Sequence, residues 1–273
     1  MAILPPVATY AFIDGNYLHT NFKGLMAAFY DVVPAIDYQR LAATLDATRF
    51  FFYDAIDYSR SDGETDADYE RRVADLEALH DHINSCPGFH VRDGHVRRSR
   101  RRGREQKGVD VQLAVDAMEH AARGNMQAAV LLAGDLDFEP LVNSLVRLGV
   151  RTRLVYVPQH TSKTLMRAAD DIRKLTLQHF HAFAGASFQR DHAAIQVRYG
   201  ERFGNDPELQ TAREGSWGGR RVRLFHRSPG GNPLLHVEQQ DELREQSYTV
   251  EYPDAAKLQA AFELSFGGSI EWR

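Results

Sequence analysis

Short apolar runs alternate with segments of helical periodicity through the N-terminal part of this 273-residue chain. The runs at 7–14 (VATYAFID) and 128–134 (AAVLLAG) are nearly free of polar residues, as strands buried on both faces usually are. Between them, residues 66–86 place their apolar side chains along one helical stripe. Strands and helices that alternate in this way predict a parallel sheet with helices on both faces.

The other segments of this region continue the alternation. Two further helices end on glycine, and the second of them opens with Pro140 in its first turn. The region closes with a helix, a short extended stretch and a second helix. We therefore expect strands at 49–57, 151–157 and within 89–98 (followed by an Asp-Gly turn), and helices at 109–124, at 140–149 and at both ends of 162–183.

The composition of the chain changes around residues 185–187. Beyond them, shorter β-like runs alternate with turns that contain Gly and Pro, and a helix-like segment follows at 255–266. We expect a first domain at 1–185 and a small α+β domain of unknown function at 186–273. The aromatic and basic run at 217–227 is similar to a surface on which single strands stack. An ordinary strand with outward arginines has the same pattern, and we prefer that interpretation.

The composition excludes several classes of protein. A content of 43% hydrophobic and 26% charged residues suits a globular chain. No stretch approaches the roughly 20 apolar residues of a membrane span, and the N-terminus lacks the features of a signal peptide, so we expect no membrane association and a cytoplasmic location. The single cysteine, Cys86, excludes an internal disulfide and a thiolate zinc site. Any metal is therefore held by oxygen or imidazole.

A cationic segment interrupts a chain whose net charge is −4. Residues 92–107 hold eight Arg or Lys against two Asp or Glu, and they lead directly into Gly108 and Asp110. Arginine makes bidentate contacts to phosphate, so this segment is a candidate clamp for a nucleic-acid backbone, with a flexible solvated loop as the alternative. The candidate nucleic-acid contacts are Arg97, Arg98, Arg100, Arg101, Arg102, Arg104 and Lys107.

Acidic residues follow the two most apolar strands, which we expect to be the central ones. Asp14 ends the first, Asp135 and Asp137 follow the second, and Asp110 lies at the start of a helix. Ligands bind at the carboxyl ends of parallel strands, and clustered carboxylates suit hard divalent cations such as Mg²⁺ and Mn²⁺. Each residue taken singly also has a structural interpretation, Asp110 through the helix dipole and Asp137 as a helix N-cap.

Four segments, taken in order, resemble the motifs of a known family. They are FIDGNY at 12–17, KGVDVQLAVDAM at 107–118, AGDLDFEPLV at 133–142 and TSKTLMRAADDIRKL at 161–175. With this order and spacing, the chain from about residue 8 to residue 180 is similar to NYN domains, which are PIN-like nucleases, and in particular to their bacterial LabA-like branch. The resemblance implies a doubly wound PIN-like fold and metal-dependent cleavage of RNA.

The resemblance also implies roles for individual residues. Mg²⁺ or Mn²⁺ is expected at the carboxylates, where it lowers the pKa of a bound water, and single-stranded RNA is the expected partner. Asn16 matches the family's turn asparagine, which is expected to orient a ligand water or the scissile phosphate. The carboxylates expected to hold the metal and carry catalysis are Asp14, Asp110, Asp135 and Asp137.

For other polar residues, the sequence provides less support for a place in the site. Asp116 lies about 120° from Asp110 around an ideal helix, so we expect it outside the set of metal ligands. Asp170 is a candidate for supporting the site, whereas Thr161 and Ser162 are expected to be helix N-caps. No zinc-type spacing is formed by His80, His82, His90 and His95.

The leading hypothesis is an endoribonuclease that hydrolyses phosphodiester bonds with a metal-activated water. Its specificity would be set by the C-terminal unit, or by a protein partner or self-association through that unit. The alternative is a catalytically weak or inactive PIN-like module that binds RNA for regulation, because a fold does not guarantee activity. A deoxyribonuclease is a third hypothesis. Acidic residues at all the main motif positions favour the enzyme.

Overall fold

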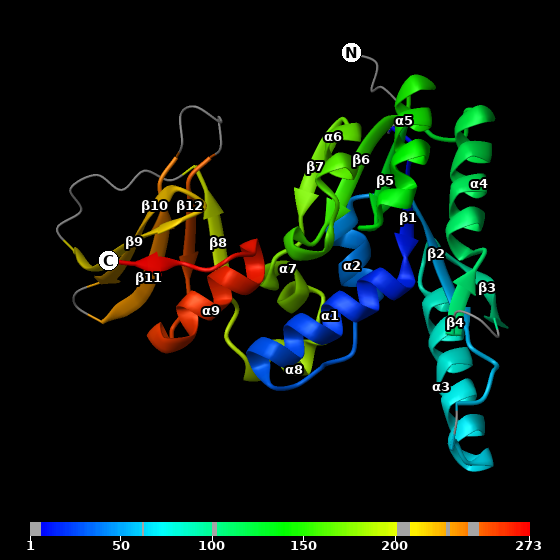
Figure 1. Cartoon of the computed structure of the whole chain (residues 1–273), viewed down its shortest axis with the longest axis horizontal. Helices are drawn as coiled ribbons and strands as arrows, with labels where there is room; N and C mark the ends of the chain where they lie inside the picture. Colours follow the sequence, from blue (N-terminus) through cyan, green and yellow to red (C-terminus); the bar gives the residue numbers. More distant parts are fainter. Residues whose placement is uncertain (1–6, 62, 100–102, 201–207, 228–229, 240–245) are drawn as a thin grey trace. The chain divides into compact units, whose positions relative to one another are not determined.

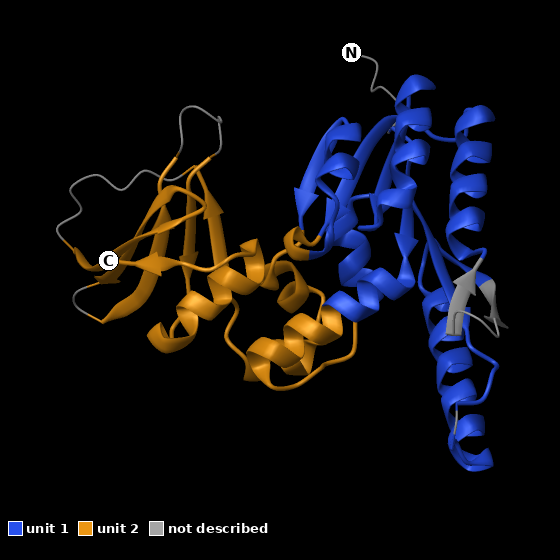
Figure 2. Cartoon of the chain, in the orientation of Figure 1, with its two compact units in different colours: residues 1–21, 38–156, 160–174 blue, residues 22–37, 157–159, 175–273 orange. Residues whose placement is uncertain are grey.

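The computed structural model describes residues 7–61, 63–99, 103–200, 208–227, 230–239 and 246–273. The chain divides into two compact units (Figure 2). Unit 1 contains residues 1–21, 38–156 and 160–174, and unit 2 contains residues 22–37, 157–159 and 175–273. Helix α1 (Gly15–Tyr30) contributes residues to both units. The division at residue 185 into separately folding domains stays a prediction.

Unit 1 is built on a seven-stranded sheet of order β4-β3-β2-β1-β5-β6-β7 (Figure 1). Strand β4 pairs antiparallel with β3, and every other pair in this sheet is parallel. The predicted doubly wound α/β fold is therefore confirmed. The strands are β1 (Thr9–Asp14), β2 (Arg49–Ile56), β3 (Phe89–Ser99), β4 (Gly103–Lys107), β5 (Ala128–Leu132), β6 (Arg151–Tyr156) and β7 (Asp171–Lys174).

Helices cover both faces of this sheet. On one face, buried residues of α4, α5 and α6 form a single core cluster with Phe12, Phe51 and Leu131 of the strands. On the other face, the rings of His19 and Tyr38 pack against Phe52, with centroid distances of 5.5 and 5.9 Å. The helices are α2 (Tyr38–Leu45), α3 (Asp66–Ser85), α4 (Val109–Ala122), α5 (Glu139–Arg147) and α6 (Lys163–Ala168), with the short 3-10 helices η1 (Leu136–Phe138) and η2 (Pro158–His160).

Strands β1 and β5 lie side by side at the centre of the sheet, as predicted from their apolar sequences. From β1 the chain adds β2 and β3 on one side, and it later returns to add β5, β6 and β7 on the other. The strand order therefore reverses between β1 and β5. In open α/β sheets, ligands bind in the crevice outside the carboxyl ends of the strands at such a reversal.

Two local expectations from the sequence are wrong. The predicted Asp-Gly turn is absent, because β3 continues through Asp93 and Gly94, which pair with Asp54 and Ala55 of β2. The pairing with β2 outweighs the local turn preference of Asp-Gly. The strand ends at Asp14 as expected, but the turn expected at Gly15-Asn16 instead forms the start of helix α1.

Unit 2 contains a six-stranded antiparallel sheet of order β13-β9-β10-β11-β12-β8. The indole of Trp217 packs against Phe262 at 5.2 Å and donates a hydrogen bond to the Gly267 carbonyl, at 2.7 Å. This tryptophan therefore has a packing role, in agreement with the interpretation preferred from the sequence. The elements are α7 (Leu177–Ala182), α8 (Ala186–Asp191), β8 (Gln196–Tyr199), β9 (Leu209–Trp217), β10 (Arg220–Arg227), β11 (Gly231–Val237), β12 (Tyr248–Glu251), α9 (Ala255–Phe266) and β13 (Glu271–Trp272).

The helices of both units are short or carry charged residues. Within the described part of the chain, none has the length and apolar character that crossing a lipid bilayer requires.

Candidate active site

Four carboxylates gather where the strand order reverses. Asp14 is the last residue of β1, and Asp135 follows β5 after two residues. Asp110 lies in the first turn of α4, and Asp137 lies in η1. Asp14 is close enough to Asp110 and Asp135 for their charges to act on it, and Asp110 is similarly affected by Asp135 and Asp137. The structure thus brings together the acidic residues that the sequence motifs singled out.

Burial and mutual repulsion favour a bound proton or cation at these carboxylates. The pKa of Asp14 is raised from 3.8 to about 6, mainly because the carboxyl group is buried. A hydrogen bond from the Tyr17 amide opposes this increase, and the charges of Asp110, Asp54 and Asp135 add to it. Loss of solvation also raises the pKa of Asp110, with smaller contributions from its acidic neighbours. A divalent cation relieves the same repulsion that a proton relieves.

Backbone amides fix the direction of two of the carboxylates. The Tyr17 amide donates to Asp14 Oδ1 at 2.9 Å, which closes the first turn of α1. The Asp137 amide donates to Asp135 Oδ1 at 3.0 Å, so Asp135 is the N-cap of η1. The expected capping role of Asp137 is therefore wrong, because the 3-10 turn precedes α5 and Phe138 stands at the N-cap of that helix.

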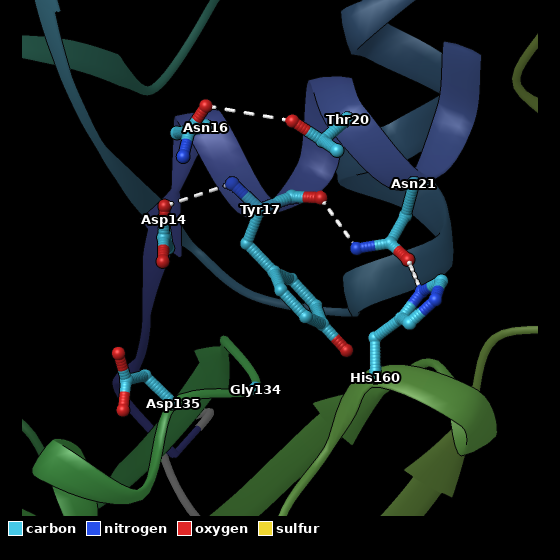
Figure 3. A pocket seen from close by; sticks show the side chains of 8 residues that line it. All are labelled: Asp14, Asn16, Tyr17, Thr20, Asn21, Gly134, Asp135 and His160. Carbon is cyan, nitrogen blue, oxygen red and sulfur yellow. Dashed lines mark hydrogen bonds between the residues drawn. The ribbon is translucent and has the colours of Figure 1, made fainter. Parts of the chain in front are cut away.

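A pocket of 380 Å³ adjoins Asp14 and Asp135 (Figure 3). These two residues form what we call the acidic wall. Asp110 and Asp137 are not among the described residues that line it. The lining consists of Asp14, Asn16, Tyr17, Thr20, Asn21, Gly134, Asp135 and His160.

The other side of the pocket is the His160 wall, formed by Tyr17, Asn21 and His160. The Asn21 amide group donates to the Tyr17 carbonyl at 2.7 Å, and Asn21 Oδ1 lies 2.5 Å from His160 Nδ1 (Figure 3). The Tyr17 hydroxyl lies 2.8 Å from the hydroxyl of Thr161. A hydrogen-bonded chain therefore links the first turns of α1 to the segment that follows β6.

Two glycines permit the close packing of this site. A Cβ atom on Gly134 would overlap the carbonyl oxygen of His160 and the ring of Tyr17. A Cβ atom on Gly15 would lie 2.8 Å from the carbonyl oxygen of Tyr53. Each glycine is the chain neighbour of an acidic-wall residue, so the glycines in FIDGNY and AGDLDF set how closely the backbone approaches the pocket.

The sequence of the NYN domain family matches residues 8–176, which include every one of these residues. The chain belongs to the NYN domain family. The predicted family is therefore confirmed, and this family is one of PIN-like nuclease domains. Membership of the LabA-like branch stays a prediction. No curated protein matches the chain.

Two solved structures are similar to the chain at low identity. A protein of unknown function from Vibrio parahaemolyticus is 19% identical, with a TM-score of 0.43 over 63% of this chain and 95% of that one. A polyphosphate kinase from Porphyromonas gingivalis is 10% identical, with a TM-score of 0.15 over 96% of this chain and 46% of that one. These scores are too low to support a shared function, so the family match alone carries the assignment.

Other acidic residues of the NYN domain have structural partners. Asp116 is buried, and its carboxylate accepts hydrogen bonds from the Tyr53 hydroxyl at 3.0 Å and the Gln112 amide at 2.9 Å. Asp116 therefore anchors α4 to β2 through Tyr53. Asp170 accepts a hydrogen bond from the Thr152 amide, so it lies at the N-terminal end of β6, whereas the site lies at the carboxyl ends of the strands.

A histidine that the sequence left unassigned lies between two carboxylates. His80 is buried, with Nδ1 2.7 Å from Asp93 and Nε2 3.4 Å from Asp54. The hydrogen bond to Asp54 raises the pKa of His80, burial lowers it, and Asp93 adds to the increase. This arrangement links α3 to β3 through Asp93 and to β2 through Asp54, whose charge also acts on Asp14.

The arginine-rich segment lies at the edge of the NYN sheet. Its backbone forms the antiparallel pair β3–β4, in which His95 pairs with Lys107 and Arg97 with Glu105. The predicted positions Arg97, Arg98, Arg104 and Lys107 belong to these strands, whereas Arg100, Arg101 and Arg102 lie outside the described residues. Contact between these residues and nucleic acid stays a prediction.

The chemistry of the acidic residues fits a hard divalent cation. Within the described ranges, no group of three or more Asp, Glu, His or Cys is already arranged to hold a metal ion. The donors are nevertheless carboxylate oxygens, and burial together with neighbouring acidic groups raises the pKa of Asp14 and of Asp110. Mg²⁺ typically uses one or two carboxylates together with waters. Mg²⁺ or Mn²⁺ therefore fits this site better than a metal that prefers sulfur.

No motif in the sequence indicates the His160 wall. Asn21 and His160 are 139 positions apart, and neither belongs to a family motif. One signal was present: Asn21 lies on the stripe of α1 that is otherwise made of buried residues such as Leu18, Phe22 and Leu25. A buried polar side chain on an apolar stripe indicates a hydrogen-bond partner, but only the three-dimensional structure shows which residue that partner is.

Proposed function

We propose that this NYN domain is a divalent-metal-dependent endoribonuclease. The observation that carries the proposal is the gathering of four carboxylates at the reversal of strand order in a PIN-like sheet. An acidic cluster repels a polyanion unless a cation is bound, so its position at the expected ligand crevice favours metal-dependent phosphate chemistry.

The residues that would hold Mg²⁺ or Mn²⁺ are Asp14, Asp110, Asp135 and Asp137. When bound, the ion supplies a more acidic water and offsets charge on the attacked phosphate. The protein's part is to position the reactants. The amides of Tyr17 and Asp137 hold the carboxylates of Asp14 and Asp135 in fixed directions, and fixed groups need little reorganisation during the reaction.

Asn16 and the basic hairpin would position the substrate. Asn16 lines the pocket two residues after Asp14, and this position supports a role for its amide in orienting the scissile phosphate or a water beside it. The hairpin β3–β4 leads through Gly108, whose φ is 100°, directly into the first turn of α4 and Asp110. A cationic strand that is continuous with the acidic site is suited to contact the RNA backbone. Sequence preference would come from unit 2 or from a partner.

The test is cleavage of structured and unstructured RNA and DNA with Mg²⁺, with Mn²⁺ and with chelator. RNA cleavage should require metal and should disappear in Asp14→Asn. Asp75→Asn removes an exposed carboxylate from α3 and is the matched control, which should retain activity. Metal-independent cleavage, or full activity of Asp14→Asn, would contradict the proposal, and preferential cleavage of DNA would replace RNA as the substrate.

A second candidate function is RNA binding without cleavage. The observation that favours it is that, among the described residues, no three or more Asp, Glu, His or Cys side chains are close enough together to hold a metal ion. This function predicts RNA affinity that is unchanged by chelator and by Asp14→Asn, together with no cleavage under any metal.

A further inference from the structure

Apart from the acidic wall, the pocket lining that the structure describes carries no formal charge when the imidazole of His160 is neutral. Apart from Asp14 and Asp135, its described lining offers amides, hydroxyls, an aromatic ring and an imidazole, with no Lys or Arg. Phosphate groups are usually held by cationic side chains or by metal. This side of the pocket therefore suits a sugar or a base better than a second phosphate.

The buried amide of Asn21 determines which nitrogen of the neutral His160 imidazole carries the hydrogen. Asn21 is 4% exposed, and its Nδ2 donates to the Tyr17 carbonyl at 2.7 Å. This bond fixes the amide orientation, so Oδ1 faces His160 Nδ1 at 2.5 Å. Because Oδ1 only accepts, Nδ1 carries the hydrogen, and the neutral imidazole has its lone pair on Nε2.

This arrangement leaves an oriented acceptor at the pocket. His160 is exposed, and its Nε2 has no hydrogen-bond partner among the residues that the structure describes. Burial of an amide is less favourable than burial of an apolar side chain of similar size unless the amide is bonded. The contribution of Asn21 on an apolar helix stripe is thus the fixed orientation of His160.

We propose that this pocket holds the ribose of an RNA nucleotide next to the scissile phosphate, and that His160 Nε2 accepts a hydrogen bond from its 2′-hydroxyl. The inference rests on the proposed function, because that function places the phosphate at the acidic wall. Phosphate oxygens carry no proton for Nε2 to accept, whereas every RNA nucleotide has a 2′-hydroxyl donor and DNA has none.

The remaining features of the pocket agree with a single unpaired nucleotide. Its volume of 380 Å³ lies within the range of about 300–1,000 Å³ that is typical of small-ligand sites. The ring of Tyr17, held at its hydroxyl by Thr161, supplies an aromatic surface for the base. Stacking on aromatic side chains is how unpaired RNA bases are commonly bound.

A deoxyribose scan tests the contact directly. In a cleaved single-stranded RNA, one 2′-deoxy substitution near the scissile bond should lower kcat/KM by about three- to tenfold, as expected for one neutral hydrogen bond. In His160→Ala, the same substitution should cause no further loss. His226→Ala, which removes an exposed histidine of β10, should retain the full loss. The proposal is overturned if no 2′-deoxy substitution lowers kcat/KM, or if the loss is equally large in His160→Ala. It is also overturned if the effect of His160→Ala depends on an amino group of a base instead of on a 2′-hydroxyl.

The role of Asn21 has its own test. Asn21→Leu should weaken RNA preference as His160→Ala does, and the double variant should be no worse than either, because both changes remove one interaction. In ¹⁵N NMR spectra of the free protein, Asn21→Leu should lose the protonated Nδ1 signal of His160. Additive losses, or an unchanged His160 tautomer, would show that Asn21 is only a packing residue.

A binding experiment separates this inference from the proposed function. Asp110 is not among the residues that line the pocket, so Asp110→Asn with Mg²⁺ keeps the His160 wall while removing one acidic residue. Matched RNA and DNA oligonucleotides should bind it with a preference for RNA of about three- to tenfold that His160→Ala abolishes. Absence of RNA cleavage by the wild-type protein would contradict the proposed function alone, and absence of the His160-dependent preference would contradict the ribose pocket alone.

Discussion

The acidic wall and the His160 wall face the same pocket but differ in what they contribute. Asp14 and Asp135 bring crowded negative charge, which favours a cation and disfavours bare phosphate. Tyr17, Asn21 and His160 bring directional hydrogen bonds from neutral groups. Under the proposed function, the acidic wall would hold the metal at the reacting phosphate, and the neutral groups would select the nucleotide.

The largest effect that separates the walls concerns catalytic rate. Asp135→Asn should lower kcat by at least about a hundredfold, because it removes a proposed ligand of the metal that offsets charge on the reacting phosphate, whereas His160→Ala should change kcat/KM by about tenfold or less. Steady-state kinetics on one RNA measures both. Equal losses in the two variants would show that the walls do not have separate roles.

The basic hairpin should act on RNA binding without affecting the acidic wall. Each phosphate contact contributes about −0.7 to the log–log slope of single-strand affinity against salt. Changing Arg97, Arg98, Arg100, Arg101 and Arg102 to Gln should therefore flatten the slope by up to about 3.5 and weaken binding for all sequences. RNA affinity at several salt concentrations is the measurement, and metal affinity should barely change. An unchanged slope would remove the hairpin from substrate binding.

Burial of the Asp14 carboxylate, together with its acidic neighbours, should lower stability in the absence of metal. The raised pKa of Asp14, about 6 against an ordinary 3.8, means that the folded state favours the protonated carboxyl. The stability that the protonated carboxyl contributes is fully present below about pH 4 and is lost as the pH rises through 6. At pH 7 the free energy of unfolding is therefore lower by up to about 3 kcal/mol than it is with Asp14 protonated.

Asp14→Asn removes that dependence on pH. With chelator present, the variant should be more stable than wild type at pH 7, and the difference should shrink toward pH 4. Urea unfolding at several pH values checks this. A variant that is less stable than wild type across the whole range would show that the charged form of Asp14 does not destabilise the folded protein.

The backbone beneath both walls should tolerate no side chain at Gly134. Gly134→Ala should destabilise the protein by about 1–3 kcal/mol, because a Cβ atom overlaps His160 and Tyr17. Gly24→Ala is the matched control, since Gly24 lies within helix α1 with no atom in the way, and it should stabilise by up to about 1 kcal/mol. Thermal unfolding of both variants measures the contrast, and a neutral Gly134→Ala would contradict the close packing.

The smallest expected effect concerns the proposed domain division at residue 185. A fragment of residues 1–185 keeps Phe22 against Phe180 and Phe183, each 5.9 Å away, but loses the contact of Phe29 with Tyr252. It should fold cooperatively with a modest loss of stability, and a fragment of residues 1–174 should be less stable. Calorimetry decides this. An insoluble 1–185 fragment would contradict separate folding.

The sequence predicted those parts of the molecule that depend on local pattern or on shared motifs. The apolar runs of β1 and β5 identified the centre of the sheet, and the motif order identified the family. Helix α1 was missed because Gly15-Asn16 has the composition of a turn, although Asp14 caps a helix there. The His160 wall was missed because its contacts join residues that only the fold brings together.

The most direct test of the central claim is a diffraction experiment on crystals soaked in Mn²⁺. Our account predicts an anomalous peak coordinated by carboxylates of Asp14, Asp110 and Asp135, with Asp137 bound directly or through water. The peak should disappear in Asp135→Asn. A crystal without bound Mn²⁺ at these residues, or with its Mn²⁺ held instead by Asp54, His80 and Asp93, would contradict the account.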